Sequence, residues 1–123
     1  MAELIKTLVG FSDTGAELVF TVATGNDFIA LDNADVRMTL IIKNTNTQNA
    51  SVTLKAGDGT LAGLGDAVIA AGGSKTIAVP FSRVESARVK VTQGTDRGKV
   101  MVASAVDAGG SLANLSIAVL SVA

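Results

Sequence analysis

The stretch "VRMTLIIKN" (36–44) decides the class of fold, because larger apolar residues occupy every second position. One face of this segment, drawn as an extended chain, collects Val36, Met38, Leu40 and Ile42. The opposite face carries Arg37, Thr39, Ile41 and Lys43. Successive side chains of a β-strand point to opposite sides of the sheet. The alternation therefore predicts a half-buried strand with one face toward a core.

Similar segments recur along the chain, separated by turns rich in Gly, Asn and Asp. Clear alternation marks 51–55, 75–80 and 87–93, and shorter candidates lie at 16–23, 27–31 and 66–71. Two segments, 98–106 and 114–122, are apolar on both faces, which indicates central strands or strands covered by another subunit. Short strands at such regular spacing predict an all-β domain. We expect one antiparallel β-sandwich over 16–123, immunoglobulin-like or jelly-roll-like, with about eight short strands.

Residues 1–15 differ from the rest, because they are apolar and contain few turn signals. They are expected to form either a first strand or an arm that docks on a neighbouring subunit. The candidate protein-interface residues of this segment are Leu4, Ile5, Leu8, Val9 and Phe11. The chain starts at Met1 and its last predicted strand runs almost to Ala123, which favours a whole gene product over an excised module.

The amino-acid composition argues against several classes of function. The 123 residues include neither His nor Cys, so the usual general base, the thiolate nucleophile and the commonest metal ligands are missing. A net charge of −1 gives no field that would attract nucleic acid or an anionic membrane. No apolar run is long enough to span a bilayer. We expect no enzyme, no catalytic residues, no cofactor, no metal, and neither nucleic-acid nor membrane partners.

The glycine-rich stretch "AGDGTLAGLGDAVIAAGGSKT" (56–76) raises the question of a phosphate-binding loop. A P-loop needs glycine directly before lysine, between a strand and a helix, whereas Ser74 precedes Lys75 and a predicted strand follows. Asp58 and Asp66 lack the alternate ligands and the closing Glu of an EF-hand loop. The glycines are interpreted as turn residues and the two aspartates as turn caps.

Two polar segments are further candidates for an interface. "RVESARVK" (83–90) gathers Arg83, Arg88 and Lys90. It lacks the aromatic residues of single-strand nucleic-acid binders, so a solvated strand face is favoured, with an inter-subunit salt-bridge role second. "NTNTQN" (44–49) is interpreted as a polar connection rather than a recognition loop.

The middle of the chain, 36–91, resembles small β-sandwich proteins encoded among the head genes of tailed bacteriophages. The resemblance lies in a strand ending in "KNTN" (43–46), the strand and loop "VTLKAGDG" (52–59), and an "LGD" step (64–66). A glycine-bearing turn and "RVESARVK" (83–90) follow. The match covers roughly half of the chain, contains no catalytic residues, and does not include residues 1–15.

This resemblance implies a head decoration, or auxiliary capsid, protein. Such proteins bind the outer surface of the assembled shell in many copies, often as trimers, and reinforce it. The implied partners are the major capsid protein and further copies of the chain, and the implied location is the virion surface after assembly in the host cytoplasm. A tail, head-fibre or coat component of a virion and an immunoglobulin-like adhesion module are the alternatives.

Overall fold

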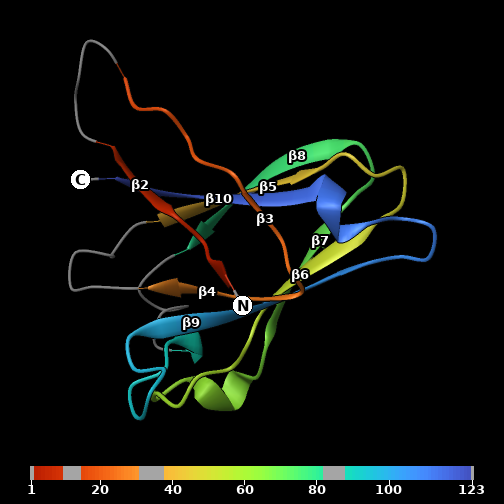
Figure 1. The fold of residues 1–123 in the computed structure, drawn as a ribbon. Coiled ribbons are helices and arrows are strands. Elements are labelled where there is room, and N and C mark those ends of the chain that lie inside the picture. The colour runs from red at the N-terminus through yellow and green to blue at the C-terminus, as the bar shows by residue number, and fades with distance from the viewer. Residues whose placement is uncertain (1, 10–14, 31–37, 82–87, 123) are drawn as a thin grey trace.

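The computed structural model of this protein describes residues 2–9, 15–30, 38–81 and 88–122, which are mostly β-structure. The described residues form ten strands and two short 3-10 turns (Figure 1). The first five strands are β1 (Ala2–Glu3), β2 (Lys6–Val9), β3 (Thr21–Val22), β4 (Asn26–Ala30) and β5 (Met38–Asn44). The other five are β6 (Ala50–Leu54), β7 (Ala67–Ala71), β8 (Lys75–Phe81), β9 (Lys99–Val106) and β10 (Leu115–Val122). The 3-10 turns are η1 (Ala62–Leu64) and η2 (Leu112–Asn114).

The strands build two mixed sheets of five strands. The first sheet has the order β1-β4-β9-β6-β7. The second has the order β2-β10-β5-β8, and β3 also pairs with β10. Ten strands replace the eight or so expected, mainly because the N-terminal segment contributes two and β3 is a short separate strand.

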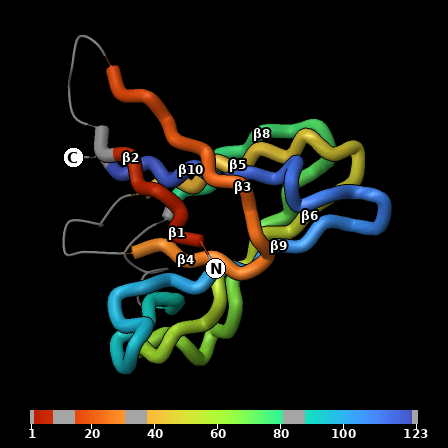
Figure 2. Tube along the Cα trace, in the orientation of Figure 1, coloured from red at the N-terminus to blue at the C-terminus, as the bar shows by residue number. Residues whose placement is uncertain are grey.

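The expectation of purely antiparallel sheets is wrong, because β1 runs parallel to β4 and β2 runs parallel to β10. Both parallel pairs come from the N-terminal segment. It starts at the edge of the first sheet, crosses at Leu4 and Ile5, and continues as an edge of the second sheet (Figure 2). One extended segment thereby closes an edge of both sheets.

Side chains from both sheets meet in a single hydrophobic core. The predicted alternation of β5 is confirmed, since Met38, Leu40 and Ile42 are all buried. Burying each such side chain contributes about 1.5–3 kcal/mol relative to leaving it exposed. The first sheet contributes Ile29, Val52, Leu54, Val100 and Val102, and β10, which neighbours β5, adds Leu115, Ile117 and Val119.

The prediction of a strand over 87–93 is wrong. Arg88 and Val89 have helical backbone geometry, and Lys90 makes only an isolated bridge to Val100. The alternating pattern does not require a strand here, because Val89 is completely buried from a helical backbone conformation while the guanidinium of Arg88 reaches the neighbouring loop. A pattern this short cannot distinguish a strand from a turn that buries one residue.

Candidate interaction surfaces

The outward face of the second sheet carries almost no charge. Its register places Ile41 beside Ala118 and Ala78, and the outward neighbours of these two alanines along β10 and β8 are uncharged. Across β5, β8 and β10 the outward positions hold one charged residue, Lys43, whose ammonium lies 5.8 Å from the ring centroid of Phe20. A face of this kind imposes little desolvation cost when another surface covers it.

The outward face of the first sheet is similar. Across β4, β6, β7 and β9 the only charged outward residue is Lys99, at the start of β9. Its ammonium lies 4.5 Å from the ring centroid of Phe28 and 3.5 Å from a carboxylate oxygen of Asp96. The outward positions of both sheets are therefore poor in charge, although Ala118 on the second sheet is already buried within the chain. A charge-poor composition is typical of the buried centre of protein interfaces.

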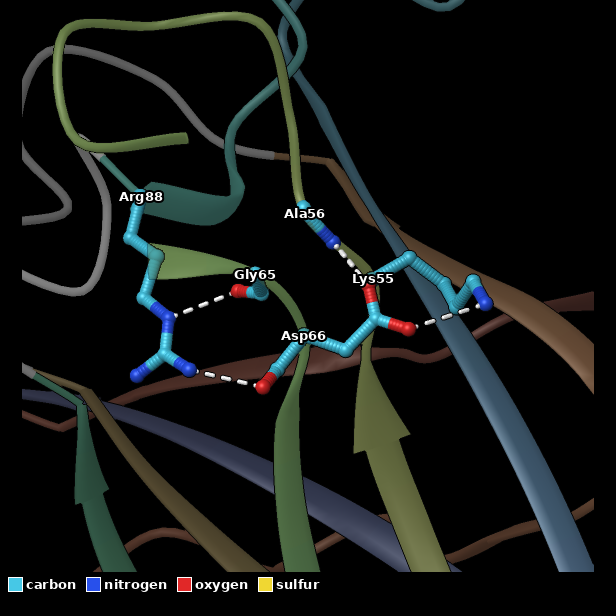
Figure 3. Close-up of polar contacts among 5 residues, drawn as sticks. All are labelled: Lys55, Ala56, Gly65, Asp66 and Arg88. Atoms are coloured by element: carbon cyan, nitrogen blue, oxygen red, sulfur yellow. Dashed lines mark hydrogen bonds and ion pairs between the residues drawn. The ribbon is translucent and has the colours of Figure 1, made fainter. Parts of the chain in front are cut away.

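Charges of both signs gather instead in the loops at one end of the molecule, drawn at the bottom of Figure 1. Asp66 accepts hydrogen bonds from the backbone N–H of Ala56 (2.7 Å) and from Nζ of Lys55 (3.1 Å). Arg88 donates to the carbonyl oxygens of Gly65 (2.7 Å) and of Asp66 itself (2.6 Å). Figure 3 shows these contacts, which fasten the loop after β6 to the segment at Arg88.

The hydrogen bond from Ala56, followed by the one from Lys55, lowers the pKa of the Asp66 carboxyl. Asp58 makes a parallel contact, accepting hydrogen bonds from the backbone N–H (2.7 Å) and the hydroxyl (2.6 Å) of Thr92. These two bonds lower the pKa of Asp58. Both carboxylates are therefore engaged in holding loops, in keeping with their interpretation as turn residues.

Arg88 is thus part of the fold as well as of the predicted basic segment. Its guanidinium donates hydrogen bonds to backbone carbonyls of the neighbouring loop. Lys90 is half-buried, and its backbone forms a β-bridge with Val100. Arg83 lies outside the described residues. An inter-subunit role for these three residues stays a prediction.

The N-terminal candidates divide into different environments. Leu4 is buried in the core of the chain itself, and its N–H donates to the carbonyl of Phe28 (2.8 Å). Ile5 is 44% exposed. Leu8 and Val9 belong to β2, opposite Ser121 and Val122 of β10, and Phe11 lies outside the described residues.

An exposed apolar edge lies along β10, and sequence reasoning missed two of its members. Val22 of β3 pairs with Ser116, while β2 begins opposite Val119, so Ile5 falls between them along the same edge. Phe20 and Val22 are 38% and 51% exposed. We call Ile5, Phe20 and Val22 the N-terminal apolar edge. The alternation in 16–23 could have shown that Phe20 and Val22 share a face, but not that this face stays open.

Asn44 and Asn46 form a buried polar network where β5 ends. Nδ2 of Asn44 donates to the carbonyls of Gln48 (2.9 Å) and Ala71 (3.2 Å), and its Oδ1 accepts from Asn46. Asn46 in turn bonds the backbone N–H and carbonyl of Ser111. The loop 44–49 is therefore a polar connection, as predicted, and two of its residues, Asn44 and Asn46, are buried and structural. Asn44 continues the inward series of β5, and this was the available signal.

Within the described ranges, no group of three or more Asp or Glu side chains is placed to hold a metal ion. No helix among those residues is long and apolar enough to cross a membrane. Comparison of the chain with protein-family models, curated proteins and solved structures finds no match.

Proposed function

We propose that this chain is a non-enzymatic virion structural protein that binds the outer capsid surface in many copies and stabilises the head. The observation that carries the proposal is the pair of charge-poor sheet faces on a β-structure in which Asp58, Asp66 and Arg88 fasten its own loops. These features suit a protein that acts by binding another surface rather than by catalysing a reaction. The resemblance of 36–91 to phage head proteins suggests that the bound surface is the outer face of a capsid.

We further infer that the two sheets form a sandwich of the immunoglobulin-like or jelly-roll-like type. Their shared core supports face-to-face packing. A rigid sandwich suits a decoration protein, because little conformational freedom is lost when it binds.

The stabilising effect follows from mass action. A protein that binds the intact shell and not its separated subunits lowers the free energy of the intact shell. Many symmetry-related copies make modest individual contacts strong together. The major capsid protein is the proposed partner, and assembly in the host cytoplasm would place the protein on the virion surface.

The N-terminal apolar edge is the proposed contact with the shell. Exposed large apolar side chains in a cluster mark binding surfaces. Ile5, Phe20 and Val22 are all exposed and lie in or next to the two short strands that pair with the same edge of β10. Deleting residues 2–12 would not test this contact, because the deletion removes Leu4 from the core and an edge strand from each sheet.

A substitution at Ile5 tests the contact without removing either strand. Purified protein is mixed with heads assembled without it, and co-sedimentation is measured for the wild type, Ile5→Asp and Leu64→Asp. Leu64 is the matched control, since it is 63% exposed in η1, away from this edge. We expect saturable binding that Ile5→Asp weakens at least tenfold, or by about 1.4 kcal/mol, and that Leu64→Asp leaves unchanged.

Equal binding by all three proteins would overturn the assignment of the contact. Absence of binding by the wild type would overturn the decoration function and would favour a tail, fibre or coat component or an adhesion module.

A further inference from the structure

The edge strands of the two sheets are not equally protected against pairing with another chain. β1 contains two residues, one of them charged, and β8 carries Lys75 and an exposed Pro80. Short length, charge and proline are the usual devices that prevent an edge strand from pairing with another chain. β7, the other end of the first sheet, has none of them.

β7 is the five-residue strand "AVIAA", with no charge, proline or glycine. It pairs with β6 on one side, and no described residue pairs with its other side. Val68 is 69% exposed, more than any other large apolar residue described, and Ala70 beside it is exposed as well. The backbone N–H and C=O groups along this edge can pair with a further strand.

The sequence of β7 is complementary to itself in antiparallel alignment. With Ile69 opposite Ile69 of a second copy, Val68 stands opposite Ala70, and the same pair repeats by symmetry. Both residues project from the outward face, since they pair with Thr53 and Ser51 of β6. Each Val68 is thus paired with an Ala70 of the other copy, and such apolar cross-strand pairs stabilise antiparallel strands.

The same register brings opposite charges together. A Cβ placed on Gly72 would lie 3.5 Å from Nζ of Lys75, so this ammonium sits beside the end of β7. In the alignment centred on Ile69, Gly72 stands opposite Asp66 of the second copy. Lys75 makes no ion pair with any residue that the structure describes, so its ammonium is available to the second copy's carboxylate.

We propose that β7 pairs with β7 of a second copy of this chain, antiparallel and about a two-fold axis at Ile69. The two first sheets then join across the dimer into one continuous sheet. Each Lys75 contacts the Asp66 carboxylate of the other copy, which then lies beside two lysine ammonium groups, Lys55 of its own chain and Lys75 of the second copy. This self-association does not depend on binding to a capsid.

The first test measures the mass of the full chain by sedimentation equilibrium. We expect a dimer, and we expect Val68→Lys to convert it to a monomer, because the substitution places a charge in the strand pair. Leu64→Lys is the matched control, since Leu64 is a similarly exposed large apolar residue that lies in η1 rather than in β7. A monomeric wild type, or an oligomer that survives Val68→Lys, would overturn the proposal.

The second test addresses the ion pairs. Lys75→Glu should raise the dimer dissociation constant at least about tenfold, since it turns two attractions into two repulsions. Lys43→Glu, an exposed lysine on the other sheet, should leave the constant unchanged. Equal effects of the two substitutions would contradict the register.

The third test uses the absence of cysteine from the chain. Directly opposed residues of antiparallel strands lie within the distance that a disulfide spans, whereas diagonal neighbours lie farther apart. The variant carrying both Val68→Cys and Ala70→Cys should therefore form covalent dimers on mild oxidation, and Val68→Cys alone should form far fewer. Cross-linking of the single variant as efficient as that of the double variant would refute the alignment at Ile69.

Discussion

Asn44 shows how a single residue at the end of a strand holds three parts of the chain together. Its amide connects the loop 44–49 to the carbonyls of Ala71 and Gly72, and Asn46 extends the connection to Ser111. A buried polar network of this kind stabilises the fold only while its members keep their partners. The alternation of β5 continues to an inward position at Asn44, but the sequence interpretation assigned this residue to the polar connection 44–49. The carbonyls that Asn44 meets come from distant segments and could not be predicted.

Asn44→Ala should lower the free energy of unfolding by about 1–3 kcal/mol, because it leaves buried groups without partners. Asn114→Ala is the control, since Asn114 is exposed and its side chain makes one long contact of 3.4 Å to Asn46. Urea unfolding of both variants measures the difference. Equal stability of the two variants would contradict a structural role for the network.

Gly57 and Gly63 belong to the same glycine-rich stretch but have different surroundings. A Cβ on Gly57 would overlap the carbonyl oxygen of Lys90, whereas a Cβ on Gly63 would meet open space. We expect Gly57→Ala to destabilise the protein by about 1–3 kcal/mol through overpacking. Gly63→Ala should be neutral or slightly stabilising. Thermal unfolding distinguishes them, and a neutral Gly57→Ala would contradict the close approach at Lys90.

At the level of elements, the loops at the charged end depend on two carboxylates. The pKa values of Asp58 and Asp66 are lowered from the ordinary 3.8, so the charged forms are the ones that favour the folded state. Their contribution is fully present above that ordinary value and is lost as the pH falls through the lower folded pKa.

Asp66→Asn should therefore lower the Tm at neutral pH and reduce the loss of stability on acidification below about pH 4. Asp58→Asn should act in the same direction through the loss of its charge-assisted bonds to Thr92. Asp107→Asn, an exposed aspartate at the end of β9, is the control. Melting curves across the acidic range measure the effect, and identical acid profiles for wild type and both variants would contradict it.

The strands differ in how well their sequences predicted them. For segments with one buried face, such as β5 and β6, the sequence predicted both the position of the strand and the side chains that it buries. Alternation over several residues has no other simple explanation. The prediction of a strand over 87–93 failed because the burial of Val89 alone accounts for the pattern. The parallel placement of β1 and β2 was not predictable, since strand direction depends on which neighbour the chain reaches rather than on local pattern.

At the scale of the whole molecule, the N-terminal segment joins the two sheets. Leu4 lies in the shared core, and the strands on either side of it close one edge of each sheet. The sequence predicted a first strand or an arm, and residues 2–9 form strands. Its apolar content could not show which residues would turn inward, and the structure separates buried Leu4 from exposed Ile5.

The measurement that tests the proposed function most directly is the melting temperature of intact heads assembled without this protein, as the purified chain is added. Mass action predicts a rise that continues with the logarithm of the free concentration once the surface sites are filled, while the amount of protein that sediments with the heads at saturation gives the copy number. The Ile5→Asp variant should require a higher concentration to produce the same rise in melting temperature. A melting temperature that stays constant at every concentration, with no protein sedimenting with the heads, would contradict the assignment as a decoration protein.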